Sequence, residues 1–392
     1  MKQKSNRIIA VIFLLLIFVF GIGTLLKCGD VYQMLIEKGG PFSPKTEIEQ
    51  SLQDNFKSRN NWINLNGLFQ RAIGTTIVRD AGGVDVYKLE NGHIAYNLEK
   101  QEMDTYAEKL QELYDYTQKR DVDFLYVQLP FKVENDDMMP IGTQEYGNDN
   151  ADILLKQLSD RQIPAMDIRS HIKSEGFEYE ELFFKTDQHW KPATALWAAG
   201  LVAKEIQDRY QVQTKDTLYN MNQYKVKTYR DWFLGSLGKR VGAWYDGTDD
   251  FDVIIPKFST DFQFFAQTAS GSIKRKGNFE KVMLKKEFIK TKDYFDLNTY
   301  AGYIGGDYAL NTIENNMAPN NKKILLLRDS FSCAMLPYLA LSADTVTAMD
   351  LRHYHDMSVA RYLEKHQIDL VIVAYNPSVF SDQPFDFFGR IQ

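Results

Sequence analysis

The amino-acid sequence predicts an α/β fold built on a doubly wound, mostly parallel sheet flanked by helices. Short apolar segments of strand length alternate with amphipathic segments of helical length. The alternation stops near residue 210 and resumes near residue 322, and the composition, with 44% hydrophobic and 25% charged residues, is that of a globular protein. We therefore expect the 392 residues to hold one large α/β domain with an insertion over about 210–320.

Residues 8–26 form an apolar run without a single charge, IIAVIFLLLIFVFGIGTLL. As a helix, such a run spans about 28 Å, close to the thickness of the hydrocarbon core of a bilayer. Lys2, Lys4 and Arg7 precede it, so we expect a single-pass membrane anchor with a cytoplasmic N-terminus and an extracytoplasmic catalytic domain. The alternative is a signal peptide cleaved near Gly23, which would release a secreted protein.

The charge of the exported part excludes one class of partner. The whole chain has a net charge of -6, but all four charged residues among the first 27 are basic. The remainder carries 42 basic and 52 acidic residues without a basic cluster, so we expect no nucleic-acid partner. Two cysteines, Cys28 and Cys333, give no disulfide framework. The expected domains are an anchor over 1–27, a stalk and entry region over 28–98, and the α/β domain over 99–392.

The individual elements follow from periodicity and turn residues. Residues 28–75 have a helical, polar-amphipathic pattern, and residues 76–98 predict a hairpin because Asn91-Gly92 separates two strand-like segments. In the α/β domain, strands are expected at residues 122–129, 163–168, 322–327, 344–350 and 369–375, and helices at residues 103–114, 151–158, 192–208, 331–341 and 357–365. Within the insertion, 251–258 and 261–267 are strand-like.

Ser330 lies where a predicted strand gives way to a predicted helix, in K-K-I-L-L-L-R-D-S-F-S-C-A. This position suits a nucleophile, because the turn exposes the Oγ at the carboxyl edge of the sheet. The helix N-terminus also offers free N–H groups and a positive dipole end to an oxyanion. Ser330 is equally well explained as a helix N-cap, a position that serine favours.

Asp187 and His189 stand two residues apart in T-D-Q-H-W, followed by Lys191-Pro192 at the start of a helix. If the chain turns sharply here, Asp187 can hold one ring nitrogen of His189 and leave the other to take a proton from Ser330. The alternative for an isolated histidine is a surface side chain with no catalytic role. We expect no metal at this motif, because Asp-x-His alone supplies too few ligands.

Together the two motifs resemble a family. The D-x-H-W segment and the later strand–D-S-F-S–helix are similar to the SGNH-hydrolase-like proteins of the alginate O-acetylation type, and most of all to the membrane-anchored DHHW proteins of Gram-positive bacteria. The resemblance implies Ser330 as nucleophile, His189 as general base and Asp187 as the residue that orients it. This sequence departs from the pattern at Arg328, where the G-D-S motif has glycine, and at Gln188, where D-H-H-W has its first histidine.

Further candidates surround these three residues in the resemblance. Gly305 and Gly306, in Y-I-G-G-D-Y, match the family's glycine block, which can donate backbone N–H groups to an acyl oxygen, or they form a simple turn. Asn376 is a candidate side-chain donor to the oxyanion or a turn residue that ends a strand. Arg352 is a candidate for orienting the substrate or for an ion pair with Asp350. The nearby His353-x-His355 lacks companion ligands, so no metal is expected there.

The resemblance implies an extracytoplasmic O-acetyltransferase that acts on a cell-surface or secreted polysaccharide and needs no cofactor. It also implies an acetyl donor supplied through a polytopic membrane acyltransferase. Two alternatives remain open from the residues alone. The same triad with water as acceptor makes an acetyl esterase or polysaccharide deacetylase, and Arg328 leaves room for a non-catalytic protein of the cell envelope that binds glycans or assists assembly.

Overall fold

A computed structural model describes residues 58–268 and 271–389, together with residues 11, 14, 15, 18, 19, 21 and 22. Most of the predicted anchor at 8–26, the cleavage point at Gly23 and the stalk up to residue 57 lie outside the described residues. Among the described residues, no helix has the length and hydropathy that crossing a membrane requires.

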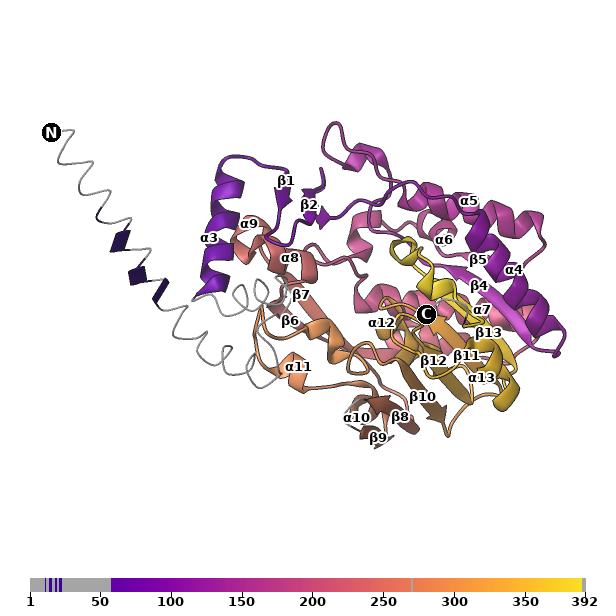
Figure 1. Cartoon of the computed structure of the whole chain (residues 1–392). Helices are drawn as coiled ribbons and strands as arrows, with labels where there is room; N and C mark the ends of the chain where they lie inside the picture. The colour runs from indigo at the N-terminus through magenta and orange to yellow at the C-terminus, as the bar shows by residue number, and fades with distance from the viewer. Residues whose placement is uncertain are drawn as a thin grey trace, which may run out of the picture.

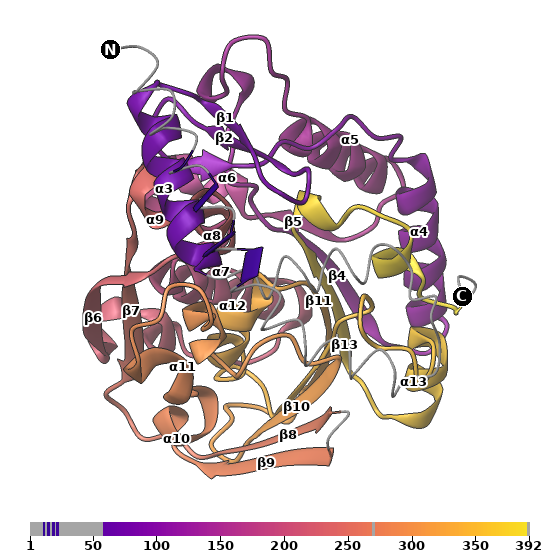
Figure 2. The same cartoon turned by 60° about the vertical axis from the view of Figure 1, so that its left-hand side comes forward.

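The centre of the fold is an eight-stranded sheet with the order β5-β4-β13-β11-β12-β10-β8-β9, seen in Figure 2. The strands that were expected in the α/β domain are β4 (Asp123–Gln128), β5 (Ala165–Asp167), β11 (Lys323–Arg328), β12 (Thr345–Met349) and β13 (Leu370–Tyr375). These five strands pair in parallel, with β13 in the middle of their group, between β4 and β11. The α/β class with a core of parallel strands is therefore confirmed.

The expectation of a mostly parallel sheet needs correction, because the sheet is mixed. β10 (Leu310–Asn315), β8 (Phe262–Thr268) and β9 (Gly271–Gly277) join it through three antiparallel pairings, against four parallel ones. All three strands come from residues 210–320, so part of the expected insertion extends the central sheet. β8 and β9 form a hairpin, which an antiparallel pair allows without a helical crossover. The division into domains stays a prediction.

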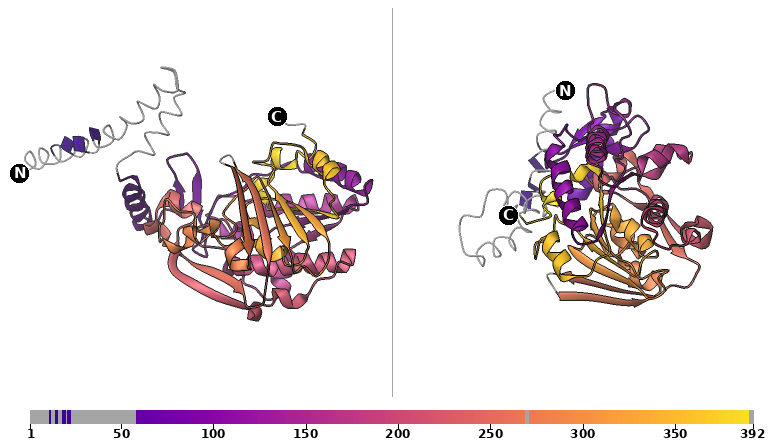
Figure 3. Two further views of the ribbon diagram at one scale, coloured as in Figure 1. Left: turned by 90° about the horizontal axis from the view of Figure 1, so that it is seen from below. Right: turned by 90° about the vertical axis from the view of Figure 1, so that its right-hand side faces the viewer.

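Helices cover both faces of the sheet because the parallel strands are apolar on both sides. On β11, Ile324 and Leu326 face one core, while Leu325 and Leu327 face the other. The first core includes α7 (Pro192–Tyr210) and α12 (Ser332–Leu339), and the second includes α4 (Asp104–Gln118), α5 (Gly147–Asp160) and α13 (Val359–Lys365). Figure 3 shows the strands side by side between these helices.

The first described elements lie at the end of the molecule away from α4 and α13 (Figure 1). They are α3 (Arg59–Ala72) and a small sheet of β1 (Ile77–Arg79), β2 (Asp85–Lys88) and β3 (Ile94–Ala95). β2 and β3 are the predicted hairpin, and Gly92 in its turn has a positive φ of 81°, a conformation that favours glycine.

The rest of the 210–320 region lies outside the central sheet, and part of it packs against α3. It contains a two-stranded sheet and four short helices: β6 (Tyr224–Phe233), β7 (Asp249–Pro256), α8 (Ser236–Val241), α9 (Ala243–Asp246), α10 (Phe279–Met283) and α11 (Glu287–Lys290). α3 packs against α8 and α9, where Gly67 leaves room for the carbonyl of Val241. The N-terminal elements are thus joined to the main domain through this region.

Candidate active site

Ser330 lies in the short turn between β11, which ends at Arg328, and α12, which begins at Ser332, as expected from the strand–turn–helix pattern. The preceding residue, Asp329, fixes this turn. One of its carboxylate oxygens accepts the N–H of Phe331 at 2.9 Å, and the other accepts the N–H of Asn376 at 2.6 Å. Asn376 directly follows β13, so the turn with Ser330 is tied to the end of the neighbouring parallel strand. Burial raises the pKa of Asp329 to about 6.

The structure brings Asp187, His189 and Ser330 together. Nε2 of His189 lies 2.8 Å from Oγ of Ser330, and Nδ1 lies 2.5 Å from Oδ1 of Asp187. The same carboxylate oxygen accepts the backbone N–H of His189 at 2.9 Å, which is the sharp turn the two-residue spacing requires. With the proton on Nδ1, the lone pair of Nε2 faces the hydroxyl of Ser330. This arrangement can remove a proton from Ser330.

Aromatic side chains hold the imidazole in this orientation. Tyr300 stacks on the ring of His189 with a centroid distance of 4.2 Å and an interplanar angle of 17°, and Phe331 contacts it at 4.9 Å. The carbonyl of Phe331 accepts hydrogen bonds from Nε1 of Trp190 at 2.9 Å and from the hydroxyl of Tyr300 at 3.1 Å. The first turn after Ser330 is therefore fastened to the loop that carries the histidine.

The second oxygen of the Asp187 carboxylate is bound by the 210–320 region. Oδ2 accepts the backbone N–H of Ser236, the first residue of α8, at 2.6 Å. Burial alone would raise the pKa of Asp187, but His189 and the N–H groups of Ser236 and His189 lower it. The carboxylate is thus kept ionised at neutral pH, which suits a group that orients and stabilises an imidazolium.

Thr186 and Asp249 anchor the same loop from the other side. Asp249, the first residue of β7, accepts the N–H groups of Lys185 and Thr186 and the Thr186 hydroxyl. The Thr186 hydroxyl oxygen in turn accepts the N–H of Gly235 at 2.9 Å. Hydrogen bonds from β7 and from the start of α8, both in the 210–320 region, therefore form a frame around Asp187.

Several residues of this frame were missed in the sequence: Tyr300, Gly235, Ser236 and Asp249. The one local signal was Gly235-Ser236, a glycine and a serine at the start of a short helix. Nothing in the sequence linked that pattern to Asp187.

The glycine block, Gly305 and Gly306, forms a tight turn. Gly305 and Gly306 have positive φ values of 107° and 102°, so the backbone turns here as only glycine allows readily. The N–H of Gly305, however, is donated to the carbonyl of Tyr303 at 2.7 Å, so it is not available to an acyl oxygen. The turn instead presents Asp307 to the guanidinium of Arg328 at 2.5 Å. This contact favours the simple turn for Gly305, and the oxyanion role of Gly305 and Gly306 stays a prediction.

For Asn376, the structure favours the turn residue over the oxyanion donor. Its side chain is fully buried, and Nδ2 donates to the carbonyl of Pro130 at 2.6 Å while Oδ1 accepts the N–H of Ser378 at 3.0 Å. It therefore ends β13 as a turn residue, the alternative that the sequence left open. The backbone N–H of Ser330 remains the better candidate, because in the described part of the chain it has no hydrogen-bond acceptor.

Arg328, the departure from G-D-S, ends β11 with a fully buried side chain. Its Nη1 lies 2.5 Å from Asp307 and 3.4 Å from Asp350. Arg352 makes a bidentate pair with Asp350 at 2.9 and 2.6 Å, which matches the ion-pair alternative rather than substrate orientation. Arg328 thus belongs to a network of ion pairs with Asp307, Asp350 and Arg352 next to the Ser330 turn.

Among the described residues, Asp307, Asp350 and His353 form a group whose ligand atoms lie within 4.8 Å of one another. The donor set does not fit a cation well, because Arg328 and Arg352 already neutralise the two carboxylates. The two carboxylates are therefore explained by their ion pairs with the arginines and not by a metal.

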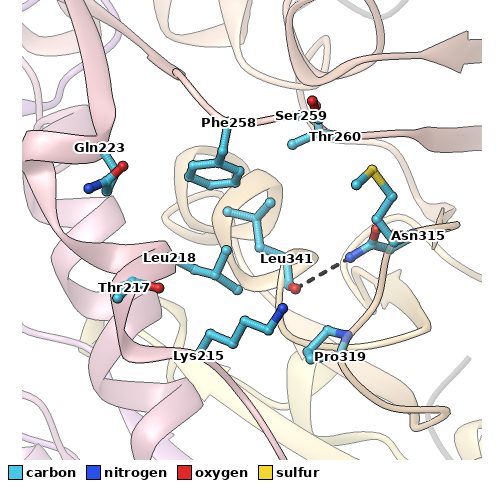
Figure 4. A pocket seen from close by; sticks show the side chains of 11 residues that line it. Lys215, Thr217, Leu218, Gln223, Phe258, Ser259, Thr260, Asn315, Pro319 and Leu341 are labelled. Atoms are coloured by element: carbon cyan, nitrogen blue, oxygen red, sulfur yellow. Dashed lines mark hydrogen bonds between the residues drawn. The ribbon is translucent and has the colours of Figure 1, made fainter.

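Two of the cavities along the described residues show how pockets lie relative to the site. One of about 940 Å³ extends from α3 and Arg79 to Ser236 and Asp296, so it reaches the residue whose N–H binds Asp187. The other, of about 470 Å³, is shown in Figure 4 and lies where Nδ2 of Asn315 donates to the carbonyl of Leu341. Asn315 ends β10, which runs antiparallel to β12, so this second cavity lies at the opposite edge of the sheet from Ser330.

Comparisons with known proteins agree with the resemblance drawn from the motifs. Residues 90–239 match the family model of the SGNH hydrolase-like domain of the acetyltransferase AlgX, a range that holds Asp187 and His189 and ends before Ser330. The predicted resemblance to SGNH-hydrolase-like proteins is confirmed by this match. No curated protein matches the sequence.

Two solved structures show the same fold. Bacillus cereus PatB1, solved with a sulfonyl adduct, has a TM-score of 0.66 and 23% identity, over 77% of this chain and 98% of its own. A DHHW family protein from Eubacterium siraeum has a TM-score of 0.57 and 18% identity, over 80% of this chain and 97% of its own.

Proposed function

We propose that this protein is a membrane-anchored, extracytoplasmic O-acetyltransferase that acetylates a cell-surface or secreted polysaccharide. The observation that carries the proposal is the chain of contacts from Asp187 through His189 to the hydroxyl of Ser330. The match of residues 90–239 to the SGNH hydrolase-like domain of an acetyltransferase supports the reaction class. The uncharged run at 8–26, preceded by basic residues, supports the anchor and the cytoplasmic N-terminus.

In the first half of the proposed reaction, Ser330 takes the acetyl group. Nε2 of His189 removes the proton from Oγ of Ser330 as Oγ attacks the carbonyl carbon of the acetyl donor. The negative charge that develops on the carbonyl oxygen is stabilised by the N–H of Ser330, at the start of α12. The tetrahedral intermediate expels the donor's oxygen, which takes the proton from His189, and an acetyl ester remains on Ser330.

In the second half, a sugar hydroxyl replaces the donor. His189 removes the proton from this hydroxyl, and its oxygen attacks the acetyl carbon on Ser330. The ester bond to Ser330 breaks, Oγ recovers a proton from His189, and the acetylated sugar leaves. The ionised Asp187 stabilises the imidazolium in both halves. The reaction needs no cofactor, and the family resemblance assigns the donor to a polytopic membrane acyltransferase.

Water in place of the sugar would make the same site an acetyl esterase or a polysaccharide deacetylase. The acceptor depends on how well the bound complex excludes water, which the arrangement of the three residues does not decide. A non-catalytic role in glycan binding or envelope assembly was suggested by Arg328. The contact between His189 and Ser330 favours the enzymatic alternatives, because a relic site has no requirement to keep it.

The test uses the full chain purified in detergent, with p-nitrophenyl acetate as donor and a panel of neutral and anionic oligosaccharides as acceptors. We expect a mass increase of one acetyl group on the peptide with Ser330, its loss in Ser330→Ala, and acetylated oligosaccharide in the presence of acceptor. Ser381→Ala, a serine in the loop after β13, serves as a matched control that keeps activity.

Each outcome separates the candidates. Acetyl transfer to an oligosaccharide supports the transferase, whereas release of acetate alone at the same rate with and without acceptor supports the esterase. The enzymatic alternatives are both wrong if neither an adduct nor turnover is found with any donor and acceptor.

A further inference from the structure

Lys132 is buried in the loop after β4, with 3% of its surface exposed. Its ammonium donates to three backbone carbonyls, those of Ile94 at 2.6 Å, Lys185 at 2.9 Å and Asp187 at 2.8 Å. An ammonium has three N–H donors, and each is used here by a main-chain oxygen. None of these hydrogen bonds goes to a carboxylate, so Lys132 is not held by a conventional ion pair.

The three carbonyls belong to the two segments that the ammonium joins. Ile94 lies in the hairpin strand β3, and its own N–H donates to the carbonyl of Lys185 at 3.0 Å. The other two carbonyls frame Thr186 in the loop that presents Asp187 and His189. Lys132 therefore fastens this loop, directly at the Asp187 main chain, to β3 and to the end of β4.

Burying a positive charge without a carboxylate partner is unfavourable for folding. Burial lowers the pKa of Lys132 to about 7, although Asp249, Asp187 and Asp246 act in the opposite direction and Lys191 adds to the lowering. The three hydrogen bonds that the ammonium donates offset part of this cost. The geometry requires a lysine at this position, because no neutral side chain offers three N–H donors from a single atom to three carbonyls.

We propose that Lys132 is a positioning residue of the acetyl transfer, which holds the main chain of Asp187 so that the carboxylate meets Nδ1 of His189. The inference rests on the proposed function for its kinetic part only. Lys132 does not contact His189 or Ser330 through any of its hydrogen bonds, so it acts through Asp187. Loss of its donors therefore loosens the Asp–His pair without removing a reacting group.

The charge state of Lys132 also predicts a pH dependence of kcat. Deprotonation leaves an amine with two N–H donors for three carbonyls, so one carbonyl loses its hydrogen bond to Lys132. Because the pKa is lowered toward neutral, this change occurs as the pH rises through about 7. We expect kcat to fall on the alkaline side of that value in the wild type, and we expect this limb to disappear in a variant without the amine.

The experiment compares Lys132→Met with the wild type and with Lys257→Met as a matched control. Lys257 also donates to a backbone carbonyl, that of Asn222, but it is exposed and lies at the end of β7. For Lys132→Met we expect at least a tenfold fall in kcat for p-nitrophenyl acetate, KM within about twofold, and a flat profile near pH 7. Lys257→Met keeps the wild-type values and profile.

A second readout does not depend on turnover. The proton that Nδ1 of His189 shares with Asp187 gives a low-field proton NMR signal, which we expect in the wild type and in Ser330→Ala and expect to be lost or shifted in Lys132→Met. If Lys132→Met keeps both the signal and kcat, the inference is wrong. If the wild type shows no turnover but Lys132→Met alters the signal, the proposed function fails and the positioning role stands.

If Lys132→Met does not fold, Lys132→Gln replaces it. The amide keeps two N–H donors and loses only the charge and the third donor, so we expect an intermediate loss of kcat. A wild-type kcat and a wild-type NMR signal in this variant overturn the inference.

Discussion

The backbone N–H of Ser236 donates to Oδ2 of Asp187 at 2.6 Å, on the opposite side of the carboxylate from His189. Ser236 opens α8, in the region that interrupts the alternation of strands and helices. That region is therefore more than an addition to the α/β domain, because it supplies the second hydrogen bond that sets the direction of the Asp187 carboxylate. The contact predicts measurable effects of substitutions at Asp187 and at the residues around it.

Asp187→Asn should lower kcat for acetyl ester turnover by roughly 10³ to 10⁴-fold, the scale known for this change in a Ser-His-Asp triad. The reason is that an amide can place its NH₂ against Nδ1 of His189 and favour the wrong tautomer. Steady-state kinetics with p-nitrophenyl acetate measures the change, and Asp160→Asn on the exposed end of α5 is the control. A kcat within threefold of wild type would show that Asp187 does not orient His189.

Gly235→Ala should reduce both activity and stability. A Cβ on Gly235 would lie 2.2 Å from Cβ of Asp187 and 2.5 Å from the carbonyl oxygen of Thr186, so the loop must move. We expect kcat to fall by at least tenfold and the free energy of unfolding to fall by about 1–3 kcal/mol.

Gly82→Ala is the matched change for this test, because its nearest atom is a side-chain oxygen of Asp80 at 3.3 Å. Urea denaturation and ester kinetics on both variants give the comparison. Equal effects of the two substitutions on kcat would contradict the close approach of Gly235 to Asp187.

Arg328→Met should destabilise the fold by about 3 kcal/mol, because it leaves the buried Asp350 with Arg352 as its remaining partner. Asp307→Asn should cost less, since the asparagine amide oxygen can still accept a hydrogen bond from Arg328 and Arg328 keeps Asp350 as a charged partner. Chemical denaturation at neutral pH measures both. A larger loss for Asp307→Asn would mean that the network is organised around Asp307 instead.

Glu145→Gln should stabilise the protein at pH 8. Burial raises the pKa of Glu145 to about 7, while Oε1 accepts the N–H groups of Leu98 and Gly147. Between about pH 4.5 and 7 the folded state binds more protons at this site than the unfolded state, so stability falls as the pH rises through that range. The amide keeps both hydrogen bonds without a charge.

We expect Glu145→Gln to gain about 1–3 kcal/mol at pH 8 and much less at pH 5. Thermal melting curves at the two pH values measure the difference. A gain that is the same at both values would show that the ionisation of Glu145 is not its cause.

Local features of the site could be predicted from the sequence because they depend on neighbouring residues. The strand–turn–helix around Ser330 follows from an apolar run, a polar turn and a helical repeat, and the Asp187–His189 turn needs only two residues of spacing. The alternating apolar residues of β11, which face two different cores, likewise indicated a sheet covered on both sides. Each of these is a property of a short segment.

Long-range relationships could not be predicted in the same way. β10, β8 and β9 join the sheet in antiparallel orientation because their partners are chosen by packing and register, and short strand-like segments carry no direction. For the same reason Arg328 gave no sign of its acidic partners, Asp307 and Asp350, which are 21 and 22 residues away along the chain.

The sequence by itself determined the α/β class, the two chemical motifs and the uncharged run at 8–26. Only the tertiary structure decided that Nε2 of His189 and Oγ of Ser330, which are 141 residues apart, lie 2.8 Å from each other. It also decided that Ser236 and Lys132 bind Asp187, and that Tyr300 stacks on His189. The physical reason is that residue types and local periodicity determine what a segment can form, whereas contacts between distant segments depend on how helices and strands pack around a common core.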